Sequence, residues 1–183
     1  MNSFHSRNFA PLAILLLIQA TLSGCAGSAG SVNRLEPASG RPDLSRYSNL
    51  VVQVGSSAPQ AGPADTARIQ QHIVRAAQTE HAGCFGNFAA APDGPQTLIA
   101  QVDLKRYDEG SAFARFMLAG LGQMHIDADL ALQDGSTAER IARYDVTKTF
   151  AWGGIYGAAT DLKGIEEGFA KAVANALCER GQR

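Results

Sequence analysis

The chain has 183 residues, of which 16 are Lys or Arg and 17 are Asp or Glu, and its formal net charge is −1. This near balance argues against the basic surface of a nucleic-acid-binding protein and against a polybasic membrane-binding surface. The length suits one domain of ordinary size.

The first 24 residues have the features of an export signal. Arg7 and the amino terminus are positive, an apolar run from Phe9 to Leu22 follows, and small residues come next. The run is too short to span a bilayer comfortably, which takes about 20 residues. The sequence therefore predicts a cleaved signal peptide over residues 1–24.

The end of this signal, Leu22, Ser23, Gly24 and Cys25, resembles the lipobox of bacterial lipoproteins, in which the cysteine is acylated and becomes the first mature residue. We expect palmitate and related acyl chains on Cys25 to anchor the protein permanently in a membrane. Because Ala26 rather than an aspartate follows, we expect the outer membrane, with the domain facing the periplasm; exposure on the cell surface stays open. The alternative is a secreted protein in which Cys25 stands there by chance.

Residues 25–46 are expected to form a flexible tether between the lipid and the domain. The segment is rich in Gly, Ser, Ala, Asn and Pro and has few large apolar side chains. About 20 such residues have an r.m.s. span near 25 Å, which would hold the domain just clear of the lipid headgroups. A single α/β domain is then expected over residues 47–183.

The domain should begin with a strand and a helix. Tyr47–Val54 predicts a strand that ends at Gly55. A helix should then run to about His81, because Asp65 and Thr66 supply capping side chains near its start. Its apolar face contains Ile69, Ile73, Ala76 and Ala77, whereas His72 and His81 are interpreted as surface residues.

Three later segments alternate apolar and polar residues, which indicates a sheet with one buried and one solvated face. They are residues 98–104, residues 124–133 and the segment that follows the turn signal Asp134-Gly135. The residues of the second segment that should face inward are Met124, Ile126, Ala128, Leu130 and Leu132. In the third segment only Lys148 departs from the alternation.

The last helix should begin after Thr160 or Asp161 and end at Gly181. Its buried stripe, at a spacing of three or four residues, contains Leu162, Ile165, Phe169, Ala172, Val173, Ala176 and Leu177. We therefore predict an α/β (α+β) fold, a two-layer sandwich in which two helices cover one face of an about four-stranded antiparallel or mixed sheet.

A set of glycines and spacings runs through the second half of the chain. It comprises Tyr107, Glu109-Gly110-Ser111, Arg115, Gly120-Leu121-Gly122, Asp134-Gly135, Gly153-Gly154 and Gly157, followed by the last helix. In these features the segment from Tyr47 to Leu177 resembles a bacterial lipoprotein family known as domain of unknown function 4410. The resemblance implies an envelope lipoprotein of unassigned activity and supplies no catalytic residues.

Two segments are candidates for contact with a partner. Ser111–Leu121 is the most apolar stretch of the mature chain; it is either a buried segment at one end of the sheet or an exposed patch that touches the membrane or a partner. The loop Trp152–Gly157 either folds over the edge of the domain or grips a partner or a glycan. The candidate interface residues are Phe113, Phe116, Met117, Leu121, Trp152 and Tyr156.

A metal site is the other chemistry considered. His125, Asp127 and Asp129 should project from the solvated face of one strand and offer ligand atoms for a divalent metal. Neighbours on one face lie about 6.5–7 Å apart, so they rarely converge on one ion, and cross-strand ion pairing with Arg143 accounts for the same residues. We therefore predict no metal site.

The two cysteines beyond the anchor, Cys84 and Cys178, form an even pair in an oxidising compartment, which favours a disulfide. Helical geometry argues the other way, because Cys178 would lie about 160° around the last helix from Leu162, away from the buried stripe. The pairing stays open at this point.

The sequence contains neither a Gly-x-Ser-x-Gly nucleophile elbow nor a His-Glu-x-x-His motif. We predict a lipid-anchored, non-enzymatic accessory domain that uses no cofactor, binds an envelope protein partner and does not bind nucleic acid. The alternatives are a small-ligand or glycan binder acting through the Trp152–Gly157 loop and a metal-dependent hydrolase acting through His125 and Asp127.

Overall fold

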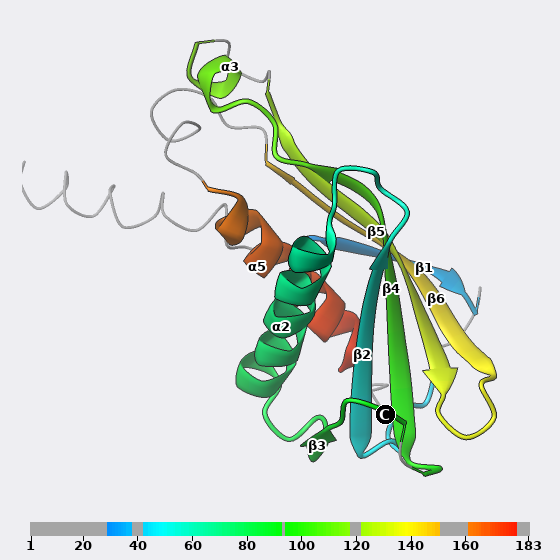
Figure 1. The fold of residues 1–183 in the computed structure, drawn as a ribbon. Helices are drawn as coiled ribbons and strands as arrows, with labels where there is room; N and C mark the ends of the chain where they lie inside the picture. Colours follow the sequence, from blue (N-terminus) through cyan, green and yellow to red (C-terminus); the bar gives the residue numbers. More distant parts are fainter. Residues whose placement is uncertain (1–28, 38–41, 93, 118–121, 151–160, 179–183) are drawn as a thin grey trace, which may run out of the picture.

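The structure is a computed structural model that describes residues 29–37, 42–92, 94–117, 122–150 and 161–178, without the side chains at positions 115 and 116. A six-stranded mixed sheet carries two long helices on one face (Figure 1). The two-layer α/β prediction is confirmed, but the sheet has two more strands than expected and there is a third, short helix. None of the helices in these ranges is long and apolar enough to cross a membrane.

The strand order in the sheet is β1-β6-β5-β4-β2-β3. The strands are β1 (Ser31–Glu36), β2 (Asn49–Ser56), β3 (Asn87–Phe88), β4 (Thr97–Asp108), β5 (Met124–Asp134) and β6 (Arg140–Phe150). Strand β2 runs parallel to β3 and β4, and the other neighbours are antiparallel. The parallel pair β2 and β4 needs a long crossover between its strands, and α2 lies within that connection.

Strand β1 corrects the predicted tether over residues 25–46. Ser31–Glu36 pairs with β6 from Ser31 opposite Thr147 to Glu36 opposite Arg143. The amide of Gly30 also donates to the carbonyl of Gly168 in the last helix at 2.9 Å, and Leu44 belongs to the core. The domain therefore begins by residue 30 rather than at residue 47.

The long helices are α2 (Pro63–Glu80) and α5 (Leu162–Leu177), which pack against each other and against the sheet. Gly62 precedes α2, and its N–H donates to Asp65 at 2.9 Å, so Asp65 stabilises the helix start from inside the first turn. Asp161 caps α5 as expected, by accepting a hydrogen bond from the Gly164 amide at 3.0 Å. Cys178, not Gly181, is the residue that follows α5; Gly181 lies outside the described residues.

The core lies between this helical layer and the sheet. Along β5, Met124 and the alternate residues to Leu132 are at most 1% exposed, which confirms the predicted inward face. Lys148, which departs from the alternation in β6, occupies an inward position and is 5% exposed. The inward face of the sheet therefore accommodates a long polar side chain near the end where β6 leaves the described residues.

Candidate functional site

Among the described elements, the one that protrudes furthest lies in the connection between β4 and β5 (Figure 1). This connection contains α3 (Ala112–Met117), which Figure 1 shows beyond the ends of both long helices. The turn into α3 is fixed by local hydrogen bonds, since the Gly110 amide donates to Asp108 at 2.8 Å and the Ala114 amide donates to the Ser111 hydroxyl at 3.2 Å. Gly110 has φ +62° and lies so close to the backbone of Gly122 that a side chain would collide with it.

Helix α3 exposes apolar side chains to solvent. Phe113 is 75% exposed and Met117 is 58% exposed, and residues four apart lie on the same side of a helix. Ser111–Leu121 was expected to be either a buried segment or an exposed patch. The exposure of Phe113 and Met117 agrees with the exposed patch. We call Phe113 and Met117, with the helix that carries them, the α3 tip.

The remaining predicted interface residues are not described in the same detail. Phe116 lies within α3, but its side chain is outside the described part of the structure, and Leu121, Trp152 and Tyr156 lie outside it entirely. The ligand-binding alternative for the Trp152–Gly157 loop stays a prediction. The lipobox residues and Cys25 also lie outside the described residues.

A buried polar network lies at the base of this protruding hairpin. Arg68 of α2 donates two hydrogen bonds to the carboxylate of Glu166 in α5, each 2.8 Å long. The hydroxyl of Tyr107, near the end of β4, donates to the same carboxylate at 2.7 Å. Asp65 accepts from Arg68 at 2.7 Å. The network therefore joins both long helices to the strand that leads into the α3 tip.

The electrostatics of this network keep Arg68 and Tyr107 protonated. The hydrogen bonds to Glu166 and Asp65 hold the pKa of the Arg68 guanidinium above its ordinary value. Burial, reinforced by the bond to Glu166, raises the pKa of the Tyr107 hydroxyl, so Tyr107 remains a donor. Groups that saturate one another in this way fasten elements together and are not free for acid–base chemistry.

The surface position predicted for His72 is wrong. His72 is 9% exposed, and its Nε2 lies 3.7 Å from the Glu166 carboxylate. The apolar residues that neighbour it on α2 turn this side of the helix toward α5. The burial of Glu166 was not predicted either, although Glu166 lies four residues after Leu162 and three before Phe169, inside the apolar stripe. A charged residue inside an apolar stripe is the sequence signal that could have indicated a buried ion pair here.

The open face of the sheet carries the residues considered as metal ligands. Both ring nitrogens of His125 have partners, with Thr149 at 3.0 Å and Gln123 at 2.9 Å. Asp129 pairs with Arg143 at 3.0 Å. Among the described residues, no group of three His, Cys, Asp or Glu side chains is placed to hold a metal ion. The polar side chains on this face therefore pair with one another across neighbouring strands.

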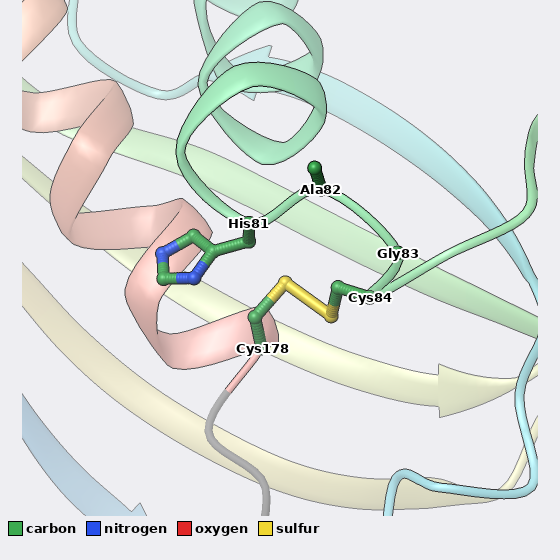
Figure 2. A pocket seen from close by; sticks show the side chains of 5 residues that line it. All are labelled: His81, Ala82, Gly83, Cys84 and Cys178. Atoms are coloured by element: carbon green, nitrogen blue, oxygen red, sulfur yellow. A yellow bond between two sulfur atoms is a disulfide. The ribbon is translucent and has the colours of Figure 1, made fainter.

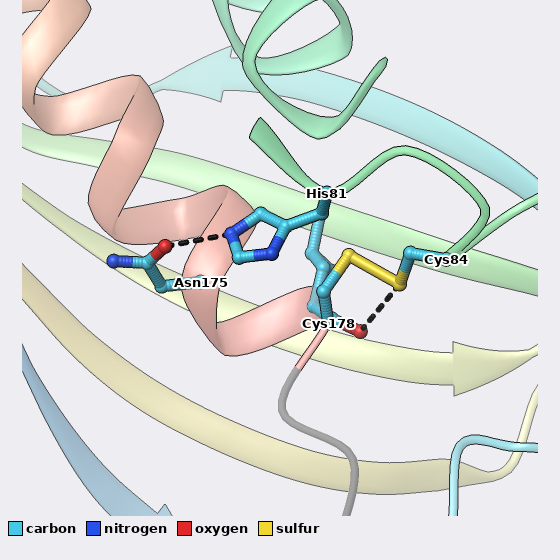
Figure 3. Close-up of a disulfide and its surroundings, with 5 residues drawn as sticks. His81, Cys84, Asn175 and Cys178 are labelled. Carbon is cyan, nitrogen blue, oxygen red and sulfur yellow. Dashed lines mark hydrogen bonds between the residues drawn. A yellow bond between two sulfur atoms is a disulfide. The ribbon is translucent and has the colours of Figure 1, made fainter. Parts of the chain in front are cut away.

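At the opposite end of the helices, Cys84 and Cys178 form a disulfide, with their Cα atoms 5.8 Å apart (Figures 2 and 3). The helical-wheel argument against this bond does not apply, because Cys178 follows the end of α5 and is not constrained to its regular face. The bond and the adjacent His81 line a small pocket (Figure 2). The disulfide fastens the end of α5 to the segment that follows α2.

Comparison with known proteins shows the family and the fold. A family model described as Domain of unknown function (DUF4410) matches residues 34–154. No curated protein matches the chain.

Among solved structures, a PelC dodecamer from Paraburkholderia phytofirmans is similar with a TM-score of 0.55 and 15% identity, over 84% of this chain and 99% of that one. A variant of that PelC gives a TM-score of 0.54 and 13% identity over the same shares. A DUF330 protein from Xanthomonas campestris gives a TM-score of 0.44 and 16% identity, over 83% of this chain and 90% of that one. At these identities the PelC likeness shows the fold alone.

Proposed function

The chain belongs to the family described as Domain of unknown function (DUF4410), and on that premise we propose that it is a lipid-anchored envelope lipoprotein whose domain binds a protein partner through the α3 tip. It acts as an accessory domain facing the periplasm from the outer membrane, without catalysis. The observation that carries this proposal is the pair of exposed apolar side chains, Phe113 and Met117, on the described element that protrudes furthest.

The exposure of these side chains supports a contact function. A phenylalanine that is 75% exposed leaves apolar surface in water that burial against a partner would remove, at about 25 cal/mol per Å². Exposed aromatic and Met side chains are also enriched at the centres of protein interfaces. Single exposed apolar residues are common. Phe113 and Met117 differ from them because they share one face of a protruding helix.

The rigidity of the base supports the same proposal. Tyr107 and its partners, the buried Glu166 and the half-buried Arg68, hold the base of the hairpin against both long helices. A tip presented on a fixed support loses less conformational entropy on binding than a free loop does. The network therefore prepares the α3 tip for contact, although it does not itself touch a partner.

The position of β1 supports a location close to the membrane. Only Ala26 to Gly30 separate Cys25 from Ser31, and so short a segment reaches at most about 20 Å when extended. Ser31 pairs with Thr147, and β6 continues from there to Phe150, which pairs with Met124 beside the α3 connection. An acylated Cys25 would thus hold the end of the sheet that carries α3 near the lipid, where a membrane-associated partner is within reach.

A second copy of this chain is one such partner. The solved PelC structures are described as dodecamers, and their fold likeness supports testing self-association first. A partner of different sequence is the other outcome of the experiment below.

The experiment is crosslinking in cells of the tagged full chain, followed by membrane extraction and mass spectrometry. Phe113→Asp and Met117→Asp should each lose the crosslinked species, because a carboxylate at the tip opposes burial. Leu35→Asp is the matched control, since Leu35 is 40% exposed but lies on β1, and it should retain the species. Thermal melting of each purified variant establishes that it is folded.

The masses identify the partner as a second copy or as another envelope protein. Retention of every crosslinked species in the folded Phe113→Asp and Met117→Asp variants would refute the proposal. Loss in Leu35→Asp alone would move the interface to the edge of the sheet and refute it as well.

A further inference from the structure

A second pocket lies on the helix-covered side of the sheet edge, between β1 and the last turn of α5. It is lined by Val32, Arg34, Tyr144, Asn175 and Ala176 and has a volume of about 380 Å³, within the range of small-molecule sites. Arg34 pairs directly with Tyr144 across the two strands, so both side chains leave the same face of the sheet toward α5. This site is remote from the α3 tip.

The guanidinium of Arg34, a residue of this lining, has one donor without a partner in the described part of the chain. Its Nη1 is inaccessible to solvent and makes no hydrogen bond among the described residues, and none of the ion pairs between them includes Arg34. A buried donor without an acceptor destabilises the folded protein, because the hydration that it loses is not replaced. An acceptor that enters the pocket would remove that destabilisation once the guanidinium turns toward it.

A second donor belongs to another residue of the lining, Asn175. The carbonyl oxygen of the Asn175 side chain lies 2.7 Å from His81 Nε2, and Figure 3 shows its amide nitrogen turned away from that ring. Asn175 is exposed, so this NH₂ group is available to a bound molecule. The phenolic group of Tyr144 completes the polar part of the lining, and no acidic side chain belongs to it.

The rest of the lining is apolar and firmly held. Val32 is 37% exposed and Ala176 contributes a methyl group. The disulfide between Cys84 and Cys178 fixes the end of α5 two residues beyond Ala176, so this wall is formed before any ligand arrives. A compact molecule with one acceptor-rich end and a short apolar portion fits these surfaces.

We propose that this pocket binds a small carboxylate, with Arg34 and Asn175 donating to its oxygens and Val32 and Ala176 contacting its apolar portion. A guanidinium presents paired N–H groups that match a carboxylate, and one cation suits a monoanion. The C-terminal end of α5 also attracts the charge of Arg34. It does not satisfy Nη1, which has no hydrogen-bond partner among the described residues.

Calorimetric titration of the detergent-extracted full chain tests the proposal. The probes are D-glucuronate and N-acetylvaline, each beside its neutral amide, so that a sugar acid and a peptide carboxyl end are distinguished. We expect at least one acid to bind at least tenfold more tightly than its amide. Arg34→Gln should weaken the binding of that acid at least tenfold, whereas Arg140→Gln should leave its affinity unchanged. Arg140 is a matched arginine whose partner is the exposed Glu36, at 3.2 Å.

A second readout guards against a misfolded variant. Methyl resonances of Val32 and Ala176 should shift on addition of the acid in the wild type, and Val32→Phe, which narrows the pocket without removing Arg34, should weaken binding. The proposal is overturned if neither acid binds, if acid and amide bind alike, or if a folded Arg34→Gln variant binds as well as the wild type. Loss of the contact at the α3 tip would leave all these results unchanged.

Discussion

Glu166 carries a carboxylate into the interior, where three described side chains act on it. Arg68 contributes two hydrogen bonds, Tyr107 contributes one, and His72 lies close by. A buried charge is tolerated when its partners compensate for lost hydration. At the scale of single residues, the site is therefore a set of mutually dependent polar groups, and removal of Glu166 takes away the buried acceptor that Arg68 and Tyr107 share.

Glu166→Gln tests this dependence. The neutral amide has the same shape, but it carries no charge and only one acceptor oxygen, so it cannot accept both hydrogen bonds from Arg68. The free energy of unfolding should therefore fall by about 2–3 kcal/mol. This is less than the full cost of breaking a buried pair, because Arg68 is 41% exposed. Urea denaturation of both proteins measures the difference. Glu167→Gln, at the neighbouring and more exposed position, should change it by less than about 0.5 kcal/mol; equal effects of the two substitutions would refute a special role for Glu166.

At the scale of elements, β1 decides where the domain begins and how it is held. Its sequence contains a Ser, an Asn and two charged residues, so it reads as a linker, yet it pairs along β6. Strand propensity depends strongly on context. Gly30 makes the entry to this strand possible, because it lies against the backbone of Thr147 and the side chain of Ala172.

Gly30→Ala should loosen the start of β1. A Cβ at this position would lie 2.5 Å from the carbonyl oxygen of Thr147, so the strand or its neighbour must shift. Hydrogen–deuterium exchange over Ser31–Glu36 should become faster. Gly55→Ala serves as the control, since a Cβ there meets nothing within 4 Å, and it should leave exchange in β1 unchanged. Protection of β1 equal to that of the wild type in Gly30→Ala would show that the close approach is not required.

At the scale of the whole molecule, acylation of Cys25 as we propose it would place the folded domain close to the membrane, because only five residues separate Cys25 from β1. A domain on a tether of about 20 residues would move freely about 25 Å from the lipid. With the sheet beginning at Ser31, the anchored domain would be restricted to a layer close to the headgroups. The α3 tip and the edge of β1 would then work within that layer.

Cys25→Ser tests the anchor. The variant should lose palmitate labelling and move from the membrane fraction to the soluble fraction, because a hydroxyl is not acylated by this route. Cys84→Ser is the control, since Cys84 is paired with Cys178, and it should keep both the label and the membrane location. Continued labelling of Cys25→Ser would show that the acylated residue is another one.

Local periodicity accounts for what could be predicted of the fold. The alternation in β5 and the stripe in α5 identify their buried faces because each pattern is complete within one element. The same reasoning did not find β1 or the two-residue strand β3, since an edge strand has a weak pattern and a two-residue strand has none. It placed His72 on the surface, because burial of that side of α2 depends on α5.

The sequence by itself determined the expected anchor, the central strands, the two long helices and the α/β class, because signals of period 2 and period 3.6 are written in consecutive residues. Only the tertiary structure decided that Ser31–Glu36 joins the sheet, that Arg68, Tyr107 and Glu166 meet, and that Cys84 pairs with Cys178. These contacts join positions 39 to 116 residues apart. Their free energy depends on which surfaces the folded elements bring together, and a local pattern carries no information about its distant partner.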